Sequence, residues 1–371
     1  IMIFGIITHA VHKIKDGQIY AYEPYVREMN LWGKYVDEII IVAPVSVNEI
    51  RSIDASYSHS NIKVIAIPNF DITSIKNIIR SILVIPKICN SIYKVMKQVN
   101  HIHLRCPGNV GLIGCLIQVF FPSKIKTAKY AGNWDPESKQ PLTYKFQKWI
   151  LGNTFLSKNI KVLVYGEWLK QSKNILPFFT ASYQKHEIEE IPKKDFNTKI
   201  KLLFVGAFSI GKQPLLSVKT TQKLISKGYN VSLDMFGNGS EFIKVEKYIS
   251  DNKLYKDIKL HGNQSKETVK QAFKNSHFLI FISKSEGWPK VVAESMFWSC
   301  LPVSTKVSCV PTMLDYGKRG CLINDNLQDA VIKIEEYLNN EKMYSESVEK
   351  AKTWSQQYTL DTFESAIKEL I

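Results

Sequence analysis

Residues 281–303 read FISKSEGWPKVVAESMFWSCLPV, and this stretch decides how the rest of the chain is interpreted. Its first residues predict a buried strand, which a polar loop and a short, mostly apolar helix follow. Pro289 suits the first position of that helix, because its fixed φ and missing N–H are tolerated there. Glu286 and Gly287 therefore lie just before a helix N-terminus, and Glu294 lies in the second turn. Strand, loop and helix in this order are typical of an α/β fold.

The two glutamates of this stretch are candidate ligand-binding groups. Glu294 lies on an otherwise mostly apolar helix, and burial of a carboxylate there is unfavourable unless a partner hydrogen-bonds it. A polar ligand is one such partner, and the N–H groups at the helix start suit a phosphate. The structural alternative is that Glu286 interacts with the helix dipole while Glu294 reaches solvent. These residues alone leave both interpretations open.

Two series of apolar strands separated by helical segments extend from this stretch. The second series begins with KLLFVGAFSIGK, a strand and loop that end at Lys212, and continues through FGNGS and LHG. The first series begins at residues 2–7 with a strand, a polar loop, a helix and another strand. The sequence therefore predicts an α/β protein with two Rossmann-like, doubly wound domains that face each other across a cleft, at residues 1–190 and 199–357.

The N-terminal half contributes its own candidates for the predicted cleft, because ligands bind at the carboxyl ends of strands in such sheets. His9, Asp16 and Gly17 lie in the loop after the first strand, with a structural role as the alternative for the histidine. Arg105 ends a later strand, and Asn133 follows another. We interpret these five residues as acceptor or cleft candidates.

Composition limits the class of protein. The chain has 371 residues and six cysteines, which form no C-x-x-C pair and lie mostly in apolar strings. This pattern indicates reduced core cysteines in a cytosolic protein. His101 and His103 form an H-x-H pair with no third ligand nearby, so we predict no metal site. The N-terminal segment resembles a first buried strand more than a signal peptide, and no apolar run approaches the ~18 residues of a membrane span.

The net charge of +15 is concentrated in the N-terminal half, mainly between residues 57 and 186. The positive electrostatic field of such a segment favours binding to nucleic acid, to an anionic membrane surface or to a phosphorylated substrate. Dispersed lysines without a recognised motif argue against nucleic acid. We expect a cytoplasmic protein with peripheral association at the inner face of the membrane.

Segment 75–99 is the candidate for that membrane contact. It alternates apolar residues with Arg80, Lys87, Lys94 and Lys97 at helical spacing. Pro86 interrupts it and predicts two helices or a kink. Core packing with a solvated basic face is the structural interpretation, and a membrane contact is the functional one.

Taken together, these strings resemble the donor-binding domain of glycosyltransferase family 4, because SEGWPKVVAESM matches the E-x7-E signature of those retaining enzymes. The resemblance covers roughly residues 201–340; YEPYVREMNLWGKYVDEIIIVAP and HLRCPGN resemble bacterial polysaccharide-assembly members more loosely. It implies the GT-B fold, a nucleotide-diphosphate sugar donor in the C-terminal domain, a saccharide or polyprenyl-linked acceptor in the N-terminal domain, and transfer with retention. It also implies that the terminal helix 358–371 packs back on the first domain.

The resemblance assigns roles to individual residues. Glu286 and Lys212 are the implied catalytic groups, the first at the donor sugar hydroxyls and the second at the diphosphate. Glu294 would hold the ribose hydroxyls. The other implied donor-binding residues are Gly206, Gly237, Gly239, Gly287, Trp288, Pro289, Lys290 and Val291. No metal and no cofactor is implied, since the nucleotide sugar is itself the donor substrate.

The chain departs from the family pattern at three places. Ala207 stands where many members have Arg, so Lys290 or Arg105 would have to compensate at the diphosphate. Ala131-Gly132 replaces a His-Gly pair, which makes Asn133 the candidate contact to the sugar. E-G-W-P shortens the usual glycine-rich loop. The alternatives are a sugar-nucleotide epimerase of the same architecture and a basic nucleic-acid-binding protein.

Overall fold

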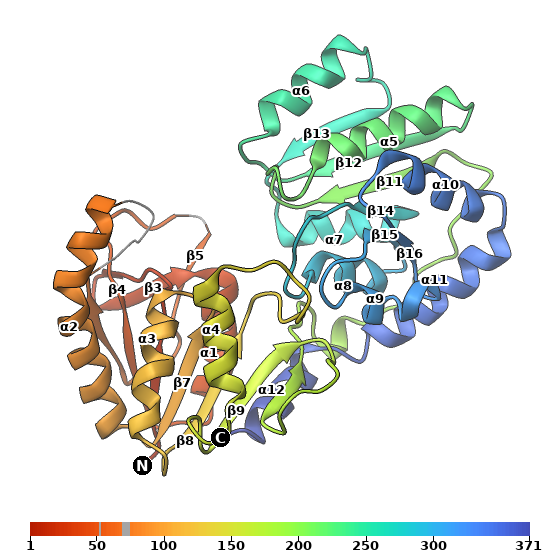
Figure 1. Cartoon of the computed structure of the whole chain (residues 1–371). Coiled ribbons are helices and arrows are strands. Elements are labelled where there is room, and N and C mark those ends of the chain that lie inside the picture. Colours follow the sequence, from red (N-terminus) through yellow and green to blue (C-terminus); the bar gives the residue numbers. More distant parts are fainter. Residues whose placement is uncertain (52, 69–74) are drawn as a thin grey trace. The chain divides into compact units, whose positions relative to one another are not determined.

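The computed structural model (Figure 1) describes the backbone of residues 1–51, 53–68 and 75–371, and the side chains of these residues except 75–82. The described chain forms two compact units. The first comprises Ile1–Phe178 and Phe363–Ile371, and the second comprises Phe179–Thr362. Residues 179–190, assigned to the first domain from the sequence, group with the second unit. Each unit is built around a parallel sheet, so the predicted α/β class is confirmed.

In the described part of the first unit, a parallel sheet of seven strands has the order β10-β9-β8-β7-β1-β4-β6. The strands are β1 (Ile3–Ile7), β4 (Glu38–Pro44), β6 (Ile62–Ile67), β7 (His101–Cys106), β8 (Ile125–Tyr130), β9 (Ile160–Tyr165) and β10 (Ile175–Phe178). The apolar runs IFGII of β1 and EIIIVAP of β4 are buried throughout most of their length, as expected for strands covered on both faces.

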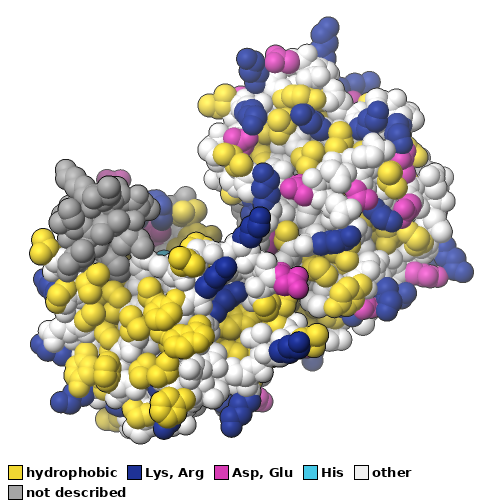
Figure 2. Space-filling view, in the orientation of Figure 1, with side chains coloured by type: hydrophobic (Ala, Val, Ile, Leu, Met, Phe, Trp, Pro, Cys, Tyr) yellow, Lys and Arg dark blue, Asp and Glu magenta, His cyan; other side chains and the backbone are white. Residues whose placement is uncertain are grey.

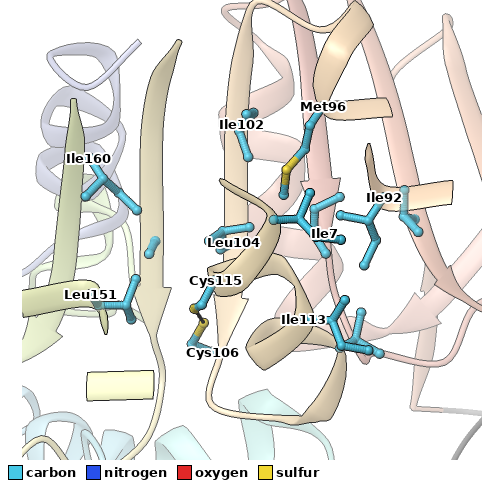
Figure 3. Packing of buried hydrophobic residues seen from close by; sticks show 14 of the residues in the cluster. Ile7, Ile92, Met96, Ile102, Leu104, Cys106, Ile113, Cys115, Leu151 and Ile160 are labelled. Atoms are coloured by element: carbon cyan, nitrogen blue, oxygen red, sulfur yellow. Dashed lines mark hydrogen bonds between the residues drawn. The ribbon is translucent and has the colours of Figure 1, made fainter. Parts of the chain in front are cut away.

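Helices pack on this sheet and complete its hydrophobic core. They are α1 (Glu23–Gly33), α2 (Ile75–Gln98), α3 (Asn109–Ile117), the 3-10 turn η1 (Gln118–Phe120) and α4 (Leu142–Gly152). Helix α3 packs between α2 and α4 along one side of the sheet (Figure 1). Figure 3 shows Ile92 and Met96 of α2 meeting Ile7 of β1 in this core. Cys106 and Cys115 are free thiols there, with their sulfurs 3.7 Å apart.

One helical segment, α2, continues across Pro86, so of the two predicted alternatives the structure excludes two separate helices. Its Ile88, Ile92 and Val95 are buried, whereas Lys94 is exposed. The described part of α2 therefore shows core packing with a solvated basic face. Arg80, the first basic residue of the predicted pattern in this helix, lies outside the described side chains.

The loop predicted after β1 contains a β-hairpin. Strands β2 (Lys13–Lys15) and β3 (Gln18–Tyr22) pair antiparallel, and β5 (Asp54–Ser56) joins them. Asp16 and Gly17 form the two-residue turn, with φ of 50° and 75°. Asp-Gly favours such turns, because both positions require positive φ. The turn lies at the exposed tip of the hairpin.

The second unit, all of whose residues are described, has a six-stranded parallel sheet of order β13-β12-β11-β14-β15-β16. The strands are β11 (Ile200–Val205), β12 (Val231–Phe236), β13 (Ile258–Gly262), β14 (Phe278–Phe281), β15 (Leu301–Thr305) and β16 (Cys321–Ile323). The helices are α5 (Pro214–Ser226), α6 (Phe242–Asp251), α7 (Lys266–Asn275), α8 (Lys290–Phe297), α9 (Val310–Met313), α10 (Leu327–Leu338) and α11 (Glu341–Ser355), with 3-10 turns η2 (Lys185–Glu187) and η3 (Asp315–Gly317).

The chain ends in α12 (Leu360–Lys368), whose last part groups with the first unit. Phe363 packs against Phe178 with ring centroids 5.4 Å apart, and Glu364 accepts hydrogen bonds from Lys34 and Tyr35. These contacts attach the C-terminal residues to the first unit. Within the described residues, the structure contains no helix that is both long and apolar enough to span a membrane.

Candidate functional site

The strand order of the second sheet places its candidate site. From β11 the chain continues to β12 and β13 on one side and then crosses to β14 on the other side. The loops that leave β11 and β14 therefore diverge, and ligands of open α/β sheets bind at such switch points. The β11 loop carries Lys212, and the β14 loop carries Glu286. Two residues separated by 74 positions are thus brought together by topology.

Lys212 and Glu286 form an ion pair at this switch point. The Lys212 ammonium donates to Glu286 Oε1, which also accepts from the Ser283 hydroxyl. The Glu286 side chain is 10% exposed and that of Lys212 is 27% exposed. The ammonium also lies 4.6 Å from the centroid of the Phe281 ring. Among the described contacts, both bonds to Glu286 end on Oε1, so Oε2 can accept from a ligand hydroxyl.

The two loops are held to each other through their backbones. Lys284 N–H donates to the Gly211 carbonyl at 2.9 Å. Ser283 is in turn fixed to β15, since its N–H donates to Thr305 Oγ1 at 3.1 Å and its carbonyl accepts from the same hydroxyl at 2.6 Å. These bonds position the ion pair without help from a ligand.

The predicted donor-binding glycines Gly206, Gly237 and Gly239 lie where the loops after β11 and β12 approach each other closely. At Gly237, φ is 132° and a Cβ atom would clash with the Gly206 carbonyl oxygen. A Cβ at Gly239 would meet the backbone of Phe208. The close contact seen at these glycines is therefore with the neighbouring β11 loop, which they allow to pack against the loop after β12.

The start of α8 agrees with the predicted strand–loop–helix order. Pro289 is the N-cap and Lys290 the first helical residue, one position later than predicted. The Gly287 carbonyl accepts from the Ser308 hydroxyl at 3.0 Å, which fixes the loop. The Trp288 ring stacks against Trp354 of α11, with centroids 6.2 Å apart. The side chain of Trp288 thus anchors the loop, while its backbone and that of Val291 lie at the helix start.

Glu294 has a partner within the protein. It is half-buried in the second turn of α8 and accepts a hydrogen bond from the Ser182 hydroxyl. Ser182 lies in the segment that opens the second unit, and its carbonyl accepts from Lys266 at 2.6 Å. The requirement for a partner is therefore met by a serine, and a ribose would have to add to or replace that bond.

The first sheet has its own switch point, between β1 and β7. His9 follows β1, and Gly108 follows β7. The His9 ring lies against Gly108, because a Cβ added there would be 2.8 Å from His9 Nδ1. Partial burial of the ring and the nearby Arg105 guanidinium lower the pKa of His9. A neutral imidazole is therefore available at this edge of the sheet.

Arg105 is paired with a residue that the sequence analysis did not identify. Its guanidinium donates to Glu28 at 2.6 Å, and both side chains are 11% exposed. It also lies 5.2 Å from the centroid of the Tyr25 ring. This pairing gives Arg105 a structural role in the first unit, and compensation for Ala207 by Lys290 or Arg105 stays a prediction.

The other first-unit candidates have local roles. Asp16 and Gly17 form the exposed hairpin tip. The side-chain oxygen of Asn133 accepts from the Asp135 N–H at 2.9 Å and so closes a turn. His101 and His103 are buried and share the Thr127 hydroxyl, at 2.9 and 2.8 Å. Among the residues that the structure describes, no three His, Cys, Asp or Glu side chains are grouped as metal ligands.

Sequence reasoning missed the partners of the candidate residues. Ser283, Ser182 and Glu28 each bond a predicted site residue. Ser283 lies at the end of a predicted strand and only three residues before Glu286, which is a weak sequence signal for their contact. Ser182 and Glu28 are separated from their partners by 112 and 77 positions, and no local pattern reveals such pairs.

Comparisons with known proteins find matches among glycosyltransferases. Residues 186–354 match the family described as Glycosyl transferases group 1, and they include all of the second sheet. An uncharacterized glycosyltransferase of Methanocaldococcus jannaschii is 29% identical over 160 residues, which are 42% of this chain and 43% of that protein. The chain thus aligns with less than half the length of this curated relative.

Solved structures share the fold along the whole chain. The lipopolysaccharide outer core galactosyltransferase WaaB has a TM-score of 0.69 at 16% identity, with 100% of this chain and 99% of that chain covered. HepE of Anabaena, in complex with UDP, has a TM-score of 0.67 at 11% identity, with 100% and 99% covered. The chain therefore has two Rossmann-like domains of the kind found in GT-B glycosyltransferases.

Proposed function

We propose that this protein is a retaining glycosyltransferase that moves a sugar from a nucleoside-diphosphate sugar to a saccharide or polyprenyl-linked acceptor. The observation that carries the proposal is the Lys212–Glu286 pair at the switch point of the second sheet. It lies inside the region that matches the group 1 family. A cation suited to a diphosphate and a carboxylate suited to sugar hydroxyls stand together there. The UDP bound to HepE supports a nucleoside diphosphate as the leaving group.

In this proposal the second unit binds the donor and stabilises the departing charge. Lys212 and the N-terminal end of α8 face the diphosphate, where fixed positive charge lowers the barrier to its departure. Glu294 accepts from the ribose hydroxyls and Glu286 from the sugar. The bond from the sugar C1 to the diphosphate oxygen breaks, and C1 bonds the acceptor oxygen on the same face. The acceptor proton leaves with the diphosphate.

The first unit binds the acceptor in this proposal, with His9 at the end of β1 as the leading contact. Its neutral ring can hydrogen-bond an acceptor hydroxyl, and Gly108 fixes the position of that ring. Asn133 and the hairpin tip are further candidates. The name of WaaB, a lipopolysaccharide outer core galactosyltransferase, supports a role in bacterial surface polysaccharide synthesis. We propose that the protein acts in the cytoplasm, at the inner face of the membrane.

We also propose catalysis without a bound metal ion or cofactor, because Lys212 and the α8 N-terminus already supply positive charge for the phosphates. Turnover measured with a chelator, and again after addition of magnesium or manganese, tests this point. The rates should be equal. Loss of turnover with chelator and its recovery with metal would contradict the proposal.

The main experiment mixes the protein with a panel of nucleotide sugars, with and without saccharide or polyprenyl-phosphate acceptors, and measures released nucleoside diphosphate. We expect release that depends on an acceptor. An epimerase would instead convert the donor with no acceptor present, and that result would overturn the proposal. The same assay applied to Lys212→Met tests the cation of the pair. Lys284→Met is its matched control, because both lysines lie in the two loops that are joined through their backbones.

A further inference from the structure

Large apolar side chains lie exposed together on the first unit. We call them the α3–α4 patch, which consists of Leu116, Phe120, Leu142, Phe146, Trp149 and Phe155. Trp149 is 56% exposed, and Phe120 and Phe155 are 72% and 76% exposed. In Figure 2 hydrophobic side chains gather over the face that carries α2, α3 and α4 in Figure 1. Contiguous apolar surface of this kind marks an interaction site.

Helix α4 shows why the patch is not simply part of the core. Ile150 and Leu151 are buried on its inner side. On the outer side, the Phe146 and Trp149 rings stack with centroids 5.7 Å apart and remain about half exposed. A helix on a protein surface normally carries polar residues on its outer face. The outer face of α4 therefore has the character of a surface that something covers.

The charges around the patch indicate what covers it. The sequence has no Asp or Glu in residues 75–134 or 138–166, which include α2, α3 and α4. Lysines are exposed on α2, on α4 and beyond it, namely Lys87, Lys94, Lys97, Lys145 and Lys158. A second copy of the chain would bring like charges together. An anionic bilayer would accept both the aromatic rings and the lysines.

A cavity of about 680 Å³ adjoins the patch at the amino-terminal ends of β8 and β9. Ile125 lines it and is 49% exposed, and Lys158, another lining residue, lies 5.4 Å from the centroid of the Phe155 ring. The charged side chains among its lining residues are all lysines, namely Lys126, Lys158, Lys161 and Lys173. Lys126 is buried and donates to the backbone carbonyls of Gln118 and Phe121. Such a cavity suits a phosphate group.

We propose that the first unit docks on an anionic lipid bilayer through the α3–α4 patch, and that the lysine-lined cavity receives a lipid phosphate group. This inference is independent of the proposed catalytic function. It also extends the membrane contact predicted for segment 75–99 to η1 and α4, where Phe120 and Trp149 are exposed. In α2, Leu83 and Tyr93 are exposed, whereas Ile88, Ile92 and Val95 are buried. Aromatic side chains at a bilayer interface and lysines near phosphates have complementary roles.

Sedimentation with vesicles tests the proposal on the full chain. The vesicles are phosphatidylcholine alone or mixed with phosphatidylglycerol, at low and high salt. We expect binding to the mixed vesicles, weakened by salt. The double variant Phe146→Ser/Trp149→Ser should bind at least tenfold more weakly, and Lys158→Ala and Lys173→Ala about fivefold each. Ile243→Ser, at an exposed apolar position on α6 in the second unit, should bind like the wild type.

Four outcomes would overturn the proposal. Equal binding to neutral and mixed vesicles, or no binding at low salt, would show that the surface does not select anionic lipid. Patch variants that bind like the wild type would place the contact elsewhere. A wild-type dimer in sedimentation velocity that the double variant converts to a monomer would make the patch a self-association surface. Unchanged thermal unfolding of the variants establishes that each is folded.

Discussion

Replacement of Lys212 by Met tests the central ion pair, because it removes the charge and keeps most of the side-chain volume. Breaking a fully buried pair costs about 3–5 kcal/mol, whereas an exposed pair contributes less than ~1 kcal/mol. The Lys212 and Glu286 side chains are 27% and 10% exposed, so the pair lies between these limits. We therefore expect the second unit to lose about 2 kcal/mol of stability. Since Tm falls by roughly 2–4 °C for each kcal/mol lost in a unit of this size, Tm should fall by about 4–8 °C.

The same variant should lose affinity for nucleoside diphosphates. A hydrogen bond to a charged group contributes about 1.5–3 kcal/mol, so we expect Kd to rise by at least about tenfold. Calorimetry with a panel of nucleoside diphosphates measures this change. Lys284→Met is the matched control, because it removes a neighbouring exposed lysine whose backbone, not its side chain, joins the two loops. Equal loss of affinity in the two variants would refute a specific role for Lys212.

Three further predictions concern the same structure. Glu294→Ala should weaken nucleoside-diphosphate binding by about 1.5–3 kcal/mol, whereas Glu286→Gln should leave this binding nearly intact and lower turnover steeply. Calorimetry measures the binding and initial rates measure the turnover; the reverse pattern would mean that the donor is placed wrongly. Gly237→Ala should destabilise the second unit by more than ~2 kcal/mol in chemical unfolding, because its Cβ would clash with Gly206. The control Gly228→Ala, at a position with positive φ but open space, should destabilise it less, and equal effects would contradict the clash. Burial lowers the pKa of His12 and His101 to about 4, so the unfolded state binds protons before the folded state does as pH falls. The stability of the first unit should therefore drop between about pH 6.5 and 4, by up to ~1.4 kcal/mol per pH unit for each histidine. An unfolding free energy that stays constant from pH 7 to 5 would contradict this prediction.

Most of the parallel strands could be predicted from the sequence, because a parallel strand buried on both faces is a continuous apolar run. Runs such as the one in β4 are apolar at nearly every position, and the helix start after Glu286 was placed to within one residue. The hairpin at Asp16 and Gly17 was missed because its pattern is inverted. Lys13 is buried there in a 2.6 Å ion pair with Asp54, while Ile14 is exposed. Local hydrophobicity cannot reveal a pair that depends on a distant carboxylate.

The candidate site shows the same division between local and distant information. The positions of Lys212 and Glu286 follow from strand ends and strand order, both of which leave sequence patterns. The partners of the candidate residues cannot be predicted in this way. Ser182 meets Glu294 only because the segment after Phe178 passes beside α8, and Glu28 meets Arg105 through the packing of α1. These contacts give Arg105 a structural ion pair, and its role as a cleft residue stays a prediction.

The central claim is that the Lys212–Glu286 site transfers a sugar with retention, and proton NMR of the product tests it most directly. The anomeric proton of the transferred sugar reports its configuration at C1. We predict that a nucleotide sugar with an α linkage yields an α-linked product, and that Glu286→Gln forms this product far more slowly. A β-linked product, or an α-linked product formed at the wild-type rate by Glu286→Gln, would contradict the account.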